Sequence, residues 1–264
     1  MAGWAFGARP LPTALGVQLY TLRTVLADDP AGTLEAVAAI GYEEVERAGL
    51  LGSGLADTRR LLSGAGLRAA SSHEAVEGIL DGPALAHASV LGQRGVVVPW
   101  IAEAYRTPDG YRRLADEMNR AGEEAAAAGL GLAYHNHDFE FTALDGGETG
   151  FGILLARCDP DLVSFQLDLF WAVHAGADPT ALFAAHPGRF SSVHVKDRTA
   201  DGTMVDVGQG AIDFVGILRG ADRAGVAHLF VEHDQPADPL ESVRTSHRAL
   251  TRIVRTVSAV PNRA

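Results

Sequence analysis

The feature that most constrains this chain is a regular alternation of short β-prone runs with longer segments rich in Ala, Leu, Arg and Glu. We predict eight strands, at residues 15–20, 43–46, 68–72, 95–98, 131–135, 163–168, 191–195 and 229–232. We predict eight intervening helices, at residues 30–40, 54–64, 83–91, 108–128, 151–157, 179–185, 213–224 and 239–257. Strands that alternate strictly with helices form a parallel sheet.

Proline and glycine support these boundaries. Four helices are predicted to begin at a proline preceded by a capping residue: Asp29-Pro30, Thr107-Pro108, Asp178-Pro179 and Asp238-Pro239. Several others are followed by a glycine stop, as at Gly41 and Gly225. The one long irregular insertion, residues 197–209, contains Asp201-Gly202, which is typical of a hairpin turn.

Eight strands in a chain of 264 residues favour a closed barrel over an open sheet. No G-x-G-x-x-G motif follows the first strand and no Walker loop is present, so we expect no nucleotide cofactor. We find no linker or low-complexity stretch. The predicted fold is therefore α/β, a single (β/α)8 TIM barrel domain spanning residues 1–264.

Composition excludes several kinds of partner. A net charge of -11 repels phosphate backbones and anionic lipid, so we expect no nucleic-acid or membrane partner. No apolar run is long enough to cross a bilayer, and the first ten residues lack the pattern of a secretory signal. The single cysteine, Cys158, is expected to be a buried filler, and its isolation favours a reducing, cytoplasmic location.

Polar residues at the ends of apolar strands are the candidate site. In a barrel, the carboxyl ends of the strands meet at the mouth, where active sites lie. These strand-end residues are Gln18, Tyr20, Glu46, Ser72, His73, Trp100, His135, His137, Asp168, His194, Lys196, Glu232 and His233.

Four strand ends favour a metal. Asp168 ends an apolar strand, although it is alternatively the N-cap of the next helix. His194 and Lys196 share one strand face. A buried Glu232 needs a cation or partner. A divalent cation suits this donor set, which has one aspartate, one glutamate and one or two histidines, with His135 among the candidates. Imidazole ligation favours Mn²⁺ or Zn²⁺ over Mg²⁺, with Co²⁺ as another candidate.

The order of these motifs resembles the sugar phosphate isomerase/epimerase superfamily, which has a xylose isomerase-like barrel. That superfamily includes tagatose and psicose epimerases, inosose isomerases and dehydratases, and endonuclease IV relatives. The motifs that carry the resemblance along nearly the whole chain are Gly16–Arg23, Ile40–Glu46, Ser71–His73, Tyr134–Phe141, Gln166–Asp168, His194–Asp197 and Val231–His233.

The resemblance implies a metal held by Glu, Asp, His and Glu from strands five to eight. Asp168, His194 and Glu232 match the last three. At the fifth strand, His135-Asn136-His137 stands where Glu-Asn-His is expected. His135 therefore replaces the glutamate, or Glu140 reaches back, or the site has fewer protein ligands. Trp171 stands where many relatives carry a second histidine. These departures make the chain similar to inosose dehydratases and to lyases of 3-keto-glycosides.

The predicted reaction is metal-dependent isomerisation or epimerisation of a keto-sugar or keto-cyclitol through an enediolate. The alternative on the same site is dehydration or β-elimination by a lyase. The candidate bases are Glu232, His137 and Glu140, in that order. Lys196 would steady negative charge. The residues predicted to bind substrate hydroxyls or stack on the sugar are Gln18, Glu46, His73, Trp100 and Asn136.

Three alternative functions are a phosphodiesterase, an inactive sugar-binding barrel and an aldolase. A phosphodiesterase similar to AP endonucleases would need more metal ligands and a basic face, which the charge disfavours. A catalytically inactive sugar-binding barrel is the alternative from another class. A Schiff-base aldolase would rely on Lys196, whose neighbour Asp197 does not lower a lysine pKa. Relatives often form homodimers or homotetramers, but no stripe in this sequence specifies an interface.

Overall fold

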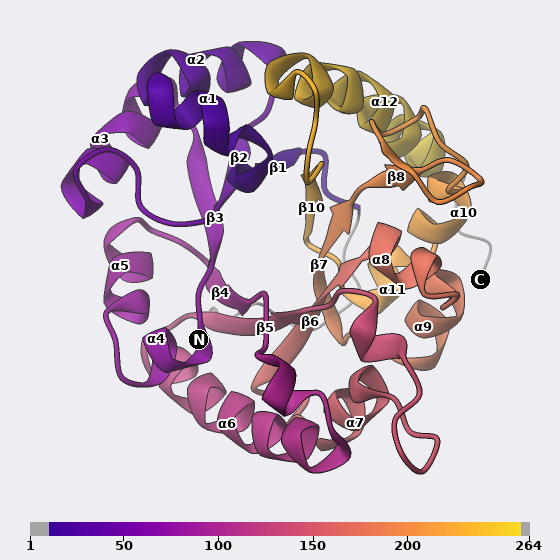
Figure 1. Cartoon of the computed structure of the whole chain (residues 1–264). Helices are drawn as coiled ribbons and strands as arrows, with labels where there is room; N and C mark the ends of the chain where they lie inside the picture. Colours follow the sequence, from indigo (N-terminus) through magenta and orange to yellow (C-terminus); the bar gives the residue numbers. More distant parts are fainter. Residues whose placement is uncertain (1–10, 260–264) are drawn as a thin grey trace.

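Eight parallel strands close into a barrel in the computed structural model, which describes residues 11–259 (Figure 1). The barrel strands are β1 (Gly16–Gln18), β2 (Glu44–Arg47), β3 (Arg68–His73), β4 (Gly95–Val98), β5 (Gly131–His135), β6 (Val163–Asp168), β7 (Phe190–Val195) and β10 (His228–Val231). Strand β1 pairs with both β2 and β10, which closes the barrel. The predicted TIM barrel is thus confirmed, while residues 1–10 and 260–264 of the predicted domain lie outside the described residues.

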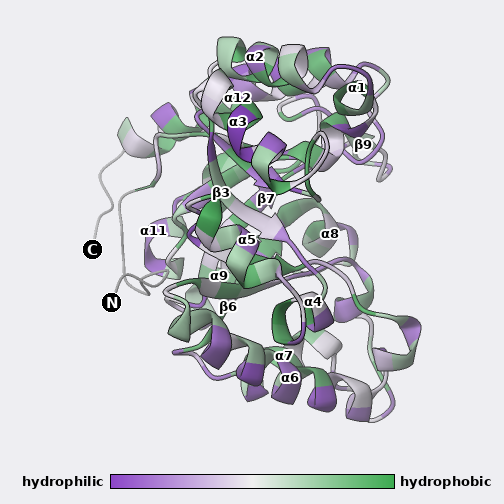
Figure 2. Cartoon of the chain, turned by 90° about the vertical axis from the view of Figure 1, so that its left-hand side faces the viewer, coloured by the Kyte–Doolittle hydropathy of each residue, from purple (hydrophilic) through white to green (hydrophobic). Residues whose placement is uncertain are grey.

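Helices surround the barrel on its outer side. They are α1 (Arg23–Asp28), α2 (Pro30–Ile40), α3 (Leu55–Ala65), α4 (Val76–Leu80), α5 (Ala84–Val90), α6 (Pro108–Ala127), α7 (Gly150–Arg157), α8 (Leu169–His174), α9 (Pro179–Ala185), α10 (Phe214–Leu218), α11 (Ala221–Ala224) and α12 (Pro239–Ala259). Figure 2 shows hydrophilic and hydrophobic residues on the same outer helices, as expected for helices with one face against the barrel. Among the described helices, none combines the length and the apolar character needed to span a membrane.

Helix capping follows the predicted chemistry. Asp29 Oδ1 accepts a hydrogen bond from Gly32 N at 2.9 Å, and Thr107 Oγ1 accepts one from Gly110 N at 3.0 Å. Asp178 caps α9 in the same way. At the other end of α2, Gly41 has a φ of 117°, a conformation that residues with a side chain rarely adopt. These caps explain why the predicted boundaries of α2 and α9 match the observed ones.

The structure corrects some predicted boundaries. The first strand ends at Gln18, and the chain continues as the 3₁₀-helix η1 (Leu19–Leu22). The single helix predicted at residues 213–224 is split into α10 and α11 before Gly220, a residue with poor helix propensity. Helices α1, α4 and α8 and two further 3₁₀-helices, η2 (Glu103–Tyr105) and η3 (Phe139–Phe141), lie in segments that were not predicted to be helical.

The insertion after β7 forms the predicted hairpin. Its strands are β8 (Asp197–Arg198) and β9 (Met204–Val205), which pair antiparallel. The Asp197 carboxylate accepts hydrogen bonds from the backbone nitrogens of Gly208, Gly210 and Ile212, at 2.9, 3.0 and 3.3 Å. One side chain at the start of β8 therefore anchors the backbone at the end of the insertion and just after it.

Strand register brings the polar residues together at the mouth. Gln18 lies beside Glu46, which lies beside Ser71. His135 lies beside Gln166, and Asp168 lies beside His194. The structure therefore places residues from distant parts of the sequence on one inner surface. Elsewhere Cys158 is buried, as predicted, and burial raises the pKa of its thiol to about 12.

Candidate metal centre at the barrel mouth

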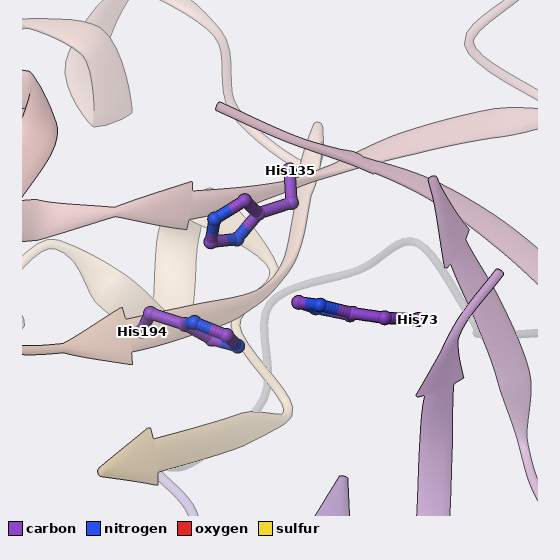
Figure 3. Close-up of side chains that lie close together, drawn as sticks. All are labelled: His73, His135 and His194. Atoms are coloured by element: carbon purple, nitrogen blue, oxygen red, sulfur yellow. The ribbon is translucent and has the colours of Figure 1, made fainter. Parts of the chain in front are cut away.

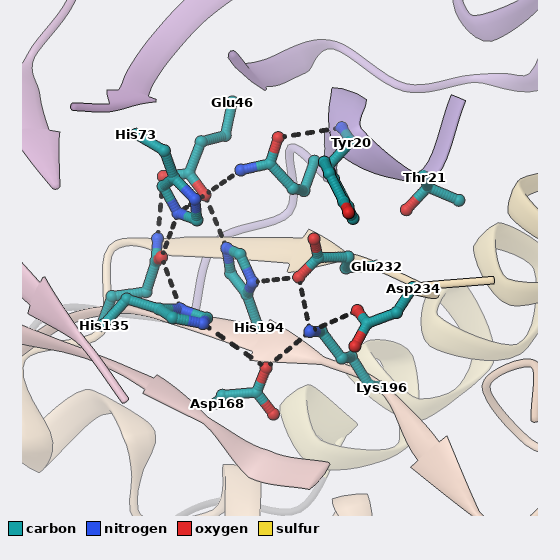
Figure 4. A network of polar contacts seen from close by, with 12 residues as sticks. Tyr20, Thr21, Glu46, His73, His135, Asp168, His194, Lys196, Glu232 and Asp234 are labelled. Atoms are coloured by element: carbon teal, nitrogen blue, oxygen red, sulfur yellow. Dashed lines mark hydrogen bonds and ion pairs between the residues drawn. The ribbon is translucent and has the colours of Figure 1, made fainter. Parts of the chain in front are cut away.

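A buried cluster of carboxylates and imidazoles lies at the carboxyl ends of β5, β6, β7 and β10 (Figure 4). Asp168, His194 and Glu232 each offer a ligand atom within 4.8 Å of the others, and all three side chains are buried. Glu232 follows the last residue of β10 directly. The predicted convergence of these three residues is therefore present in the structure.

Asp168 has two roles at once. Its Oδ1 accepts a hydrogen bond from Trp171 N at 2.9 Å and so caps α8. Its Oδ2 is buried and has no hydrogen-bond partner among the described residues. That oxygen instead forms an ion pair with Lys196 at 3.0 Å. The capping interpretation and the ligand interpretation of Asp168 are therefore compatible, because each uses a different oxygen.

His135 presents a nitrogen lone pair to this cluster. Its Nδ1 lies 3.1 Å from Gln166 Oε1, an amide oxygen that can only accept, so Nδ1 carries the proton. The unprotonated Nε2 lies 3.9 Å from Asp168 Oδ2. Burial, followed by the nearby His194, holds the pKa of His135 well below its ordinary value, so the ring is neutral. This is the state and orientation that a metal-binding histidine requires.

His194 lies between two carboxylates. Its Nδ1 is 2.7 Å from Glu232 Oε2, and its Nε2 is 2.6 Å from Glu46 Oε1. Burial alone would lower the pKa of His194, but the charges of Glu232 and Glu46 outweigh it and raise that pKa to about 10. A carboxylate on Nε2 is the arrangement that orients a histidine for binding a metal through its other nitrogen.

Glu46 is the centre of the polar network. Besides His194, its carboxylate receives hydrogen bonds from Gln18, Ser71 and Gln166 at 2.9, 2.6 and 2.8 Å. Its Oε1 also lies 3.0 Å from His73 Nε2. Burial opposes ionisation of Glu46, but the charges of His73 and His194 and their hydrogen bonds keep its pKa well below the ordinary value. Glu46 thus holds the histidines in place as an anion.

Lys196 is a second positively charged group in the cluster, beside His194. Its Nζ lies 3.0 Å from Asp168 Oδ2, 2.8 Å from Glu232 Oε2 and 2.7 Å from Asp234 Oδ1. Burial would lower the pKa of Lys196, but the three carboxylates raise it above the ordinary value. An ammonium held in this way is not a Schiff-base nucleophile, which needs a lowered pKa.

The donor set fits a divalent cation. One imidazole nitrogen, from His194, and two carboxylate oxygens, from Asp168 and Glu232, lie within 4.8 Å of one another, and His135 Nε2 lies beside them, 3.9 Å from Asp168 Oδ2. Asp168 Oδ2 is buried without a hydrogen bond among the described residues and is balanced there by the Lys196 ammonium at 3.0 Å, so a positive charge already occupies the place that a metal cation would take. Mixed nitrogen and oxygen donors suit Zn²⁺ and Mn²⁺.

A second group of histidines lies next to this one. Figure 3 shows His73, His135 and His194, whose ligand atoms also fall within 4.8 Å of one another. The His73 and His194 rings stack with centroids 5.4 Å apart. However, His73 Nε2 faces both Gln166 and Glu46, and His194 Nε2 faces Glu46. The first group supplies two carboxylates as well as an imidazole, and mixed oxygen and nitrogen donors suit a divalent cation, so the first group is the better metal site.

Other residues predicted for catalysis or substrate binding occupy the surroundings. Both Glu140 oxygens are engaged, by Tyr134 Oη at 2.7 Å and by His137 N at 2.8 Å, and neither contacts the three ligand residues. Asn136 Oδ1 accepts from Asp168 N at 2.9 Å and so ties β5 to β6. Glu140 and Asn136 therefore hold backbone and neighbouring side chains rather than facing the mouth.

His137 and Trp100 lie at the rim. His137 Nδ1 is buried without a hydrogen-bond partner among the described residues. Burial, then the charge of Lys196, lowers the His137 pKa to about 3. Trp100 is 54% exposed and packs edge-on against His137, with ring centroids 5.1 Å apart. An exposed indole beside the cluster is suited to stacking on a sugar face.

Sequence reasoning missed three residues of this network. Gln166 links His73, His135, Glu46 and Ser192 through its amide. Ser71 donates to Glu46, and Asp234 pairs with Lys196. A polar residue inside an apolar strand was the available signal for Gln166, because a buried amide needs partners.

Comparisons with known proteins agree with this fold. A family model described as xylose isomerase-like TIM barrel matches residues 34–253. A crystal structure of a sugar phosphate isomerase/epimerase from Parabacteroides distasonis superposes with a TM-score of 0.80 at 27% identity, covering 95% of this chain and 98% of that one. A structure of the IOLI protein with a binding zinc atom has a TM-score of 0.72 at 16% identity, covering 92% and 99%.

Among curated proteins, an inosose dehydratase of Lacticaseibacillus casei is 30% identical over 159 residues. The match covers 51% of this chain and 52% of that enzyme. The chain thus spans about half the length of the curated relatives that it matches first.

Proposed function

This chain belongs to the xylose isomerase-like TIM barrel family, and we propose that it is a divalent-metal-dependent sugar isomerase or epimerase. Its substrate would be a keto-sugar or keto-cyclitol, and its reaction would pass through an enediolate. The observation that carries this proposal is the buried convergence of Asp168, His194 and Glu232, with the His135 lone pair beside them.

The four residues that would hold the cation are His135, Asp168, His194 and Glu232. When bound, the cation would polarise a substrate carbonyl and so acidify the proton on the adjacent carbon. We propose Mn²⁺ as the resident ion, with Zn²⁺, Co²⁺ or Mg²⁺ as alternatives; imidazole donors make Mg²⁺ the weakest of these. The IOLI protein, whose structure has the same fold, has a binding zinc atom, which supports a divalent cation here without selecting Mn²⁺ over Zn²⁺.

Glu232 is our first candidate for the base that removes the α-proton. Both of its described contacts, to His194 and Lys196, use Oε2. Its Oε1 is therefore the oxygen that can turn toward a substrate. Neutral His137, with an unpartnered Nδ1, is the second candidate. Glu140 has a pKa near neutrality, which would suit a base, but geometry decides first, and its oxygens face Tyr134 and the His137 backbone.

We assign Lys196 to charge stabilisation and Trp100 to substrate binding. The Lys196 ammonium can stabilise negative charge that develops on a substrate oxygen. Trp100 would stack on an apolar sugar face at the rim. Three predicted substrate-binding residues would position other groups rather than contact the substrate. Glu46 contacts His194, Gln18 and His73, and Gln18 Oε1 accepts a hydrogen bond from Tyr20 N.

A dehydratase or lyase is the second candidate function. It shares proton removal at the α-carbon and differs in losing a hydroxyl or glycosidic oxygen from the next carbon. The similarity to an inosose dehydratase favours this alternative specifically. The product formed from each substrate class would separate the two.

The metal is tested by measuring bound metal in purified protein and in an Asp168→Ala/Glu232→Ala double variant. The matched control is Glu43→Gln, an exposed carboxylate just before β2, at the opposite end of the barrel. We expect one ion per chain in the wild type and the control and none in the double variant. Absence of metal from all three after incubation with Mn²⁺ would refute the metal site.

The carbonyl chemistry is tested by incubating the protein in deuterated water with ketoses, inososes and 3-keto-glucosides. Nuclear magnetic resonance (NMR) would detect deuterium at the α-carbon. We expect exchange in at least one class. Exchange without net conversion would still support enediolate formation, whereas no exchange in any class would leave an inactive sugar-binding barrel as the better interpretation.

A further inference from the structure

The single lysine of the chain lies where two of the proposed metal ligands converge. Lys196 is buried, and its Nζ is within 3.0 Å of both Asp168 Oδ2 and Glu232 Oε2. Glu232 Oε2 also lies 2.7 Å from His194 Nδ1, and Asp168, His194 and Glu232 each offer a ligand atom within 4.8 Å of the others. A third carboxylate, Asp234, contacts Nζ from the outer side at 2.7 Å and is 29% exposed (Figure 4).

We propose that the Lys196 ammonium and a divalent cation are alternative occupants of the Asp168–Glu232 pair. When the cation enters, Lys196 leaves both carboxylates and keeps Asp234 as its partner. Asp234 is thus the residue that receives the displaced lysine. This inference rests on the proposed metal site and adds a built-in competitor to it.

The Lys196 ammonium and a metal ion would exclude each other, because both would bind Asp168 Oδ2 and Glu232 Oε2. A metal bound through Asp168 Oδ2 and Glu232 Oε2 lies about 2.0–2.2 Å from each oxygen. An ammonium 2.8–3.0 Å from the same two oxygens would then be close to a doubly charged ion. In a buried site such like charges repel strongly, because little solvent screens them. Glu232 Oε2 also lies 2.7 Å from His194 Nδ1, so the metal would be a third group at this one oxygen if Lys196 stayed.

Asp234 gives the displaced lysine a defined destination. It follows β10 in the loop at the mouth, and its side chain is more exposed than those of Asp168 and Glu232. A lysine that keeps only this contact moves outward, toward the space where a substrate enters. Metal loading would therefore deliver the ammonium to the substrate, and the charge would be withheld in the metal-free protein.

The experiment uses the fact that the chain has one lysine. Protein labelled with ¹⁵N-lysine gives one side-chain ammonium signal, and Zn²⁺ is diamagnetic, so this signal can be followed through a Zn²⁺ titration. We expect a second signal, in slow exchange with the first, that is complete at one Zn²⁺ per chain. Calorimetry would measure the Zn²⁺ affinity of the wild type, Lys196→Met and Asp234→Asn proteins. Arg60→Met, which removes an exposed cation far from the mouth, is the control.

Competition predicts that Lys196→Met binds Zn²⁺ at least about tenfold more tightly than the wild type. Asp234→Asn should bind it more weakly, because the displaced lysine then has no carboxylate, and Arg60→Met should be unchanged. Stoichiometric Zn²⁺ binding with an unmoved lysine signal would overturn this inference while leaving the metal site intact. Failure of both wild type and Lys196→Met to bind Zn²⁺ would overturn the metal site as well. If Lys196→Met does not fold, the NMR titration of the wild type still shows whether Zn²⁺ displaces Lys196.

Discussion

Replacing Glu140 by glutamine should stabilise the protein in alkaline solution and have little effect in acid. The Glu140 carboxyl is fully buried, and burial raises its pKa from the ordinary value of 4.5 to about 7, against the hydrogen bonds from Tyr134 and His137. A glutamine can accept from His137 N and donate to Tyr134 Oη, so it preserves both contacts. The substitution therefore removes only the unfavourable free energy of burying a negative charge.

The size and sign of the effect follow from proton linkage. A carboxyl whose pKa is raised on folding contributes stability that is complete below pH 4.5 and is lost as the pH rises through about 7. The gap is about 2.5 pH units, at about 1.4 kcal/mol per unit, so the charge costs about 3 kcal/mol at pH 8.5. Glu140→Gln should recover that amount at pH 8.5 and almost none at pH 4.5.

Urea unfolding of wild type and Glu140→Gln between pH 4.5 and 8.5 measures this difference. The control is Glu148→Gln, since Glu148 is 55% exposed and pairs with Arg112 at the surface. We expect the Glu140→Gln advantage to grow with pH and the control curve to stay parallel to the wild type. A variant that is less stable at pH 8.5 would refute the reasoning. Loss of α-proton exchange in a folded Glu140→Gln protein would identify Glu140 as the base.

Three further predictions concern the network, the rim and the core. Glu46→Gln should lower the free energy of unfolding in urea by about 3–5 kcal/mol, because His194 and the other donors lose a buried anion; a loss under about 1 kcal/mol would contradict this. Trp100→Ala should raise KM about tenfold with kcat little changed in steady-state assays, whereas an unchanged KM would remove Trp100 from the substrate site. Gly150→Ala should destabilise the fold by about 1–3 kcal/mol in thermal melts, since a Cβ there would lie 2.1 Å from Tyr111 Cζ; an unchanged Tm would argue against this packing.

The fold was largely predictable because its boundaries are local. Proline after a capping residue and glycine at a helix end act within one helical turn, so α2 could be placed from sequence alone. Helix α8 could not, because Leu169–His174 continues the apolar run of β6 and contains β-prone aromatic residues. Only the capping bond from Asp168 to Trp171 N marks its start.

The site was predictable to the extent that it lies at strand ends. Asp168 ends its strand, Glu232 directly follows one and His194 is the last residue but one of another, and a barrel brings such ends together. Gln166 was not predicted, because its importance depends on which strands lie beside β6 and on their register. Strand order and register both depend on residues far apart in the sequence, so a local pattern does not reveal them. Asp234 lies beyond its strand, and only the fold of the loop brings it to Lys196.

Asp197 links the charged cluster to the hairpin that follows it. Its neighbour Lys196 belongs to the charged cluster, while its own carboxylate holds the backbone of the following insertion at Gly208, Gly210 and Ile212. Residues 199–203, the turn of this hairpin, can thus change in length or composition while Asp197 stays in place. Met204 is tied to the cluster, because Asp234 N donates a hydrogen bond to its Sδ at 3.3 Å. The variable part of this lip of the mouth is therefore the tip of the hairpin, and the strands below it are held by the cluster.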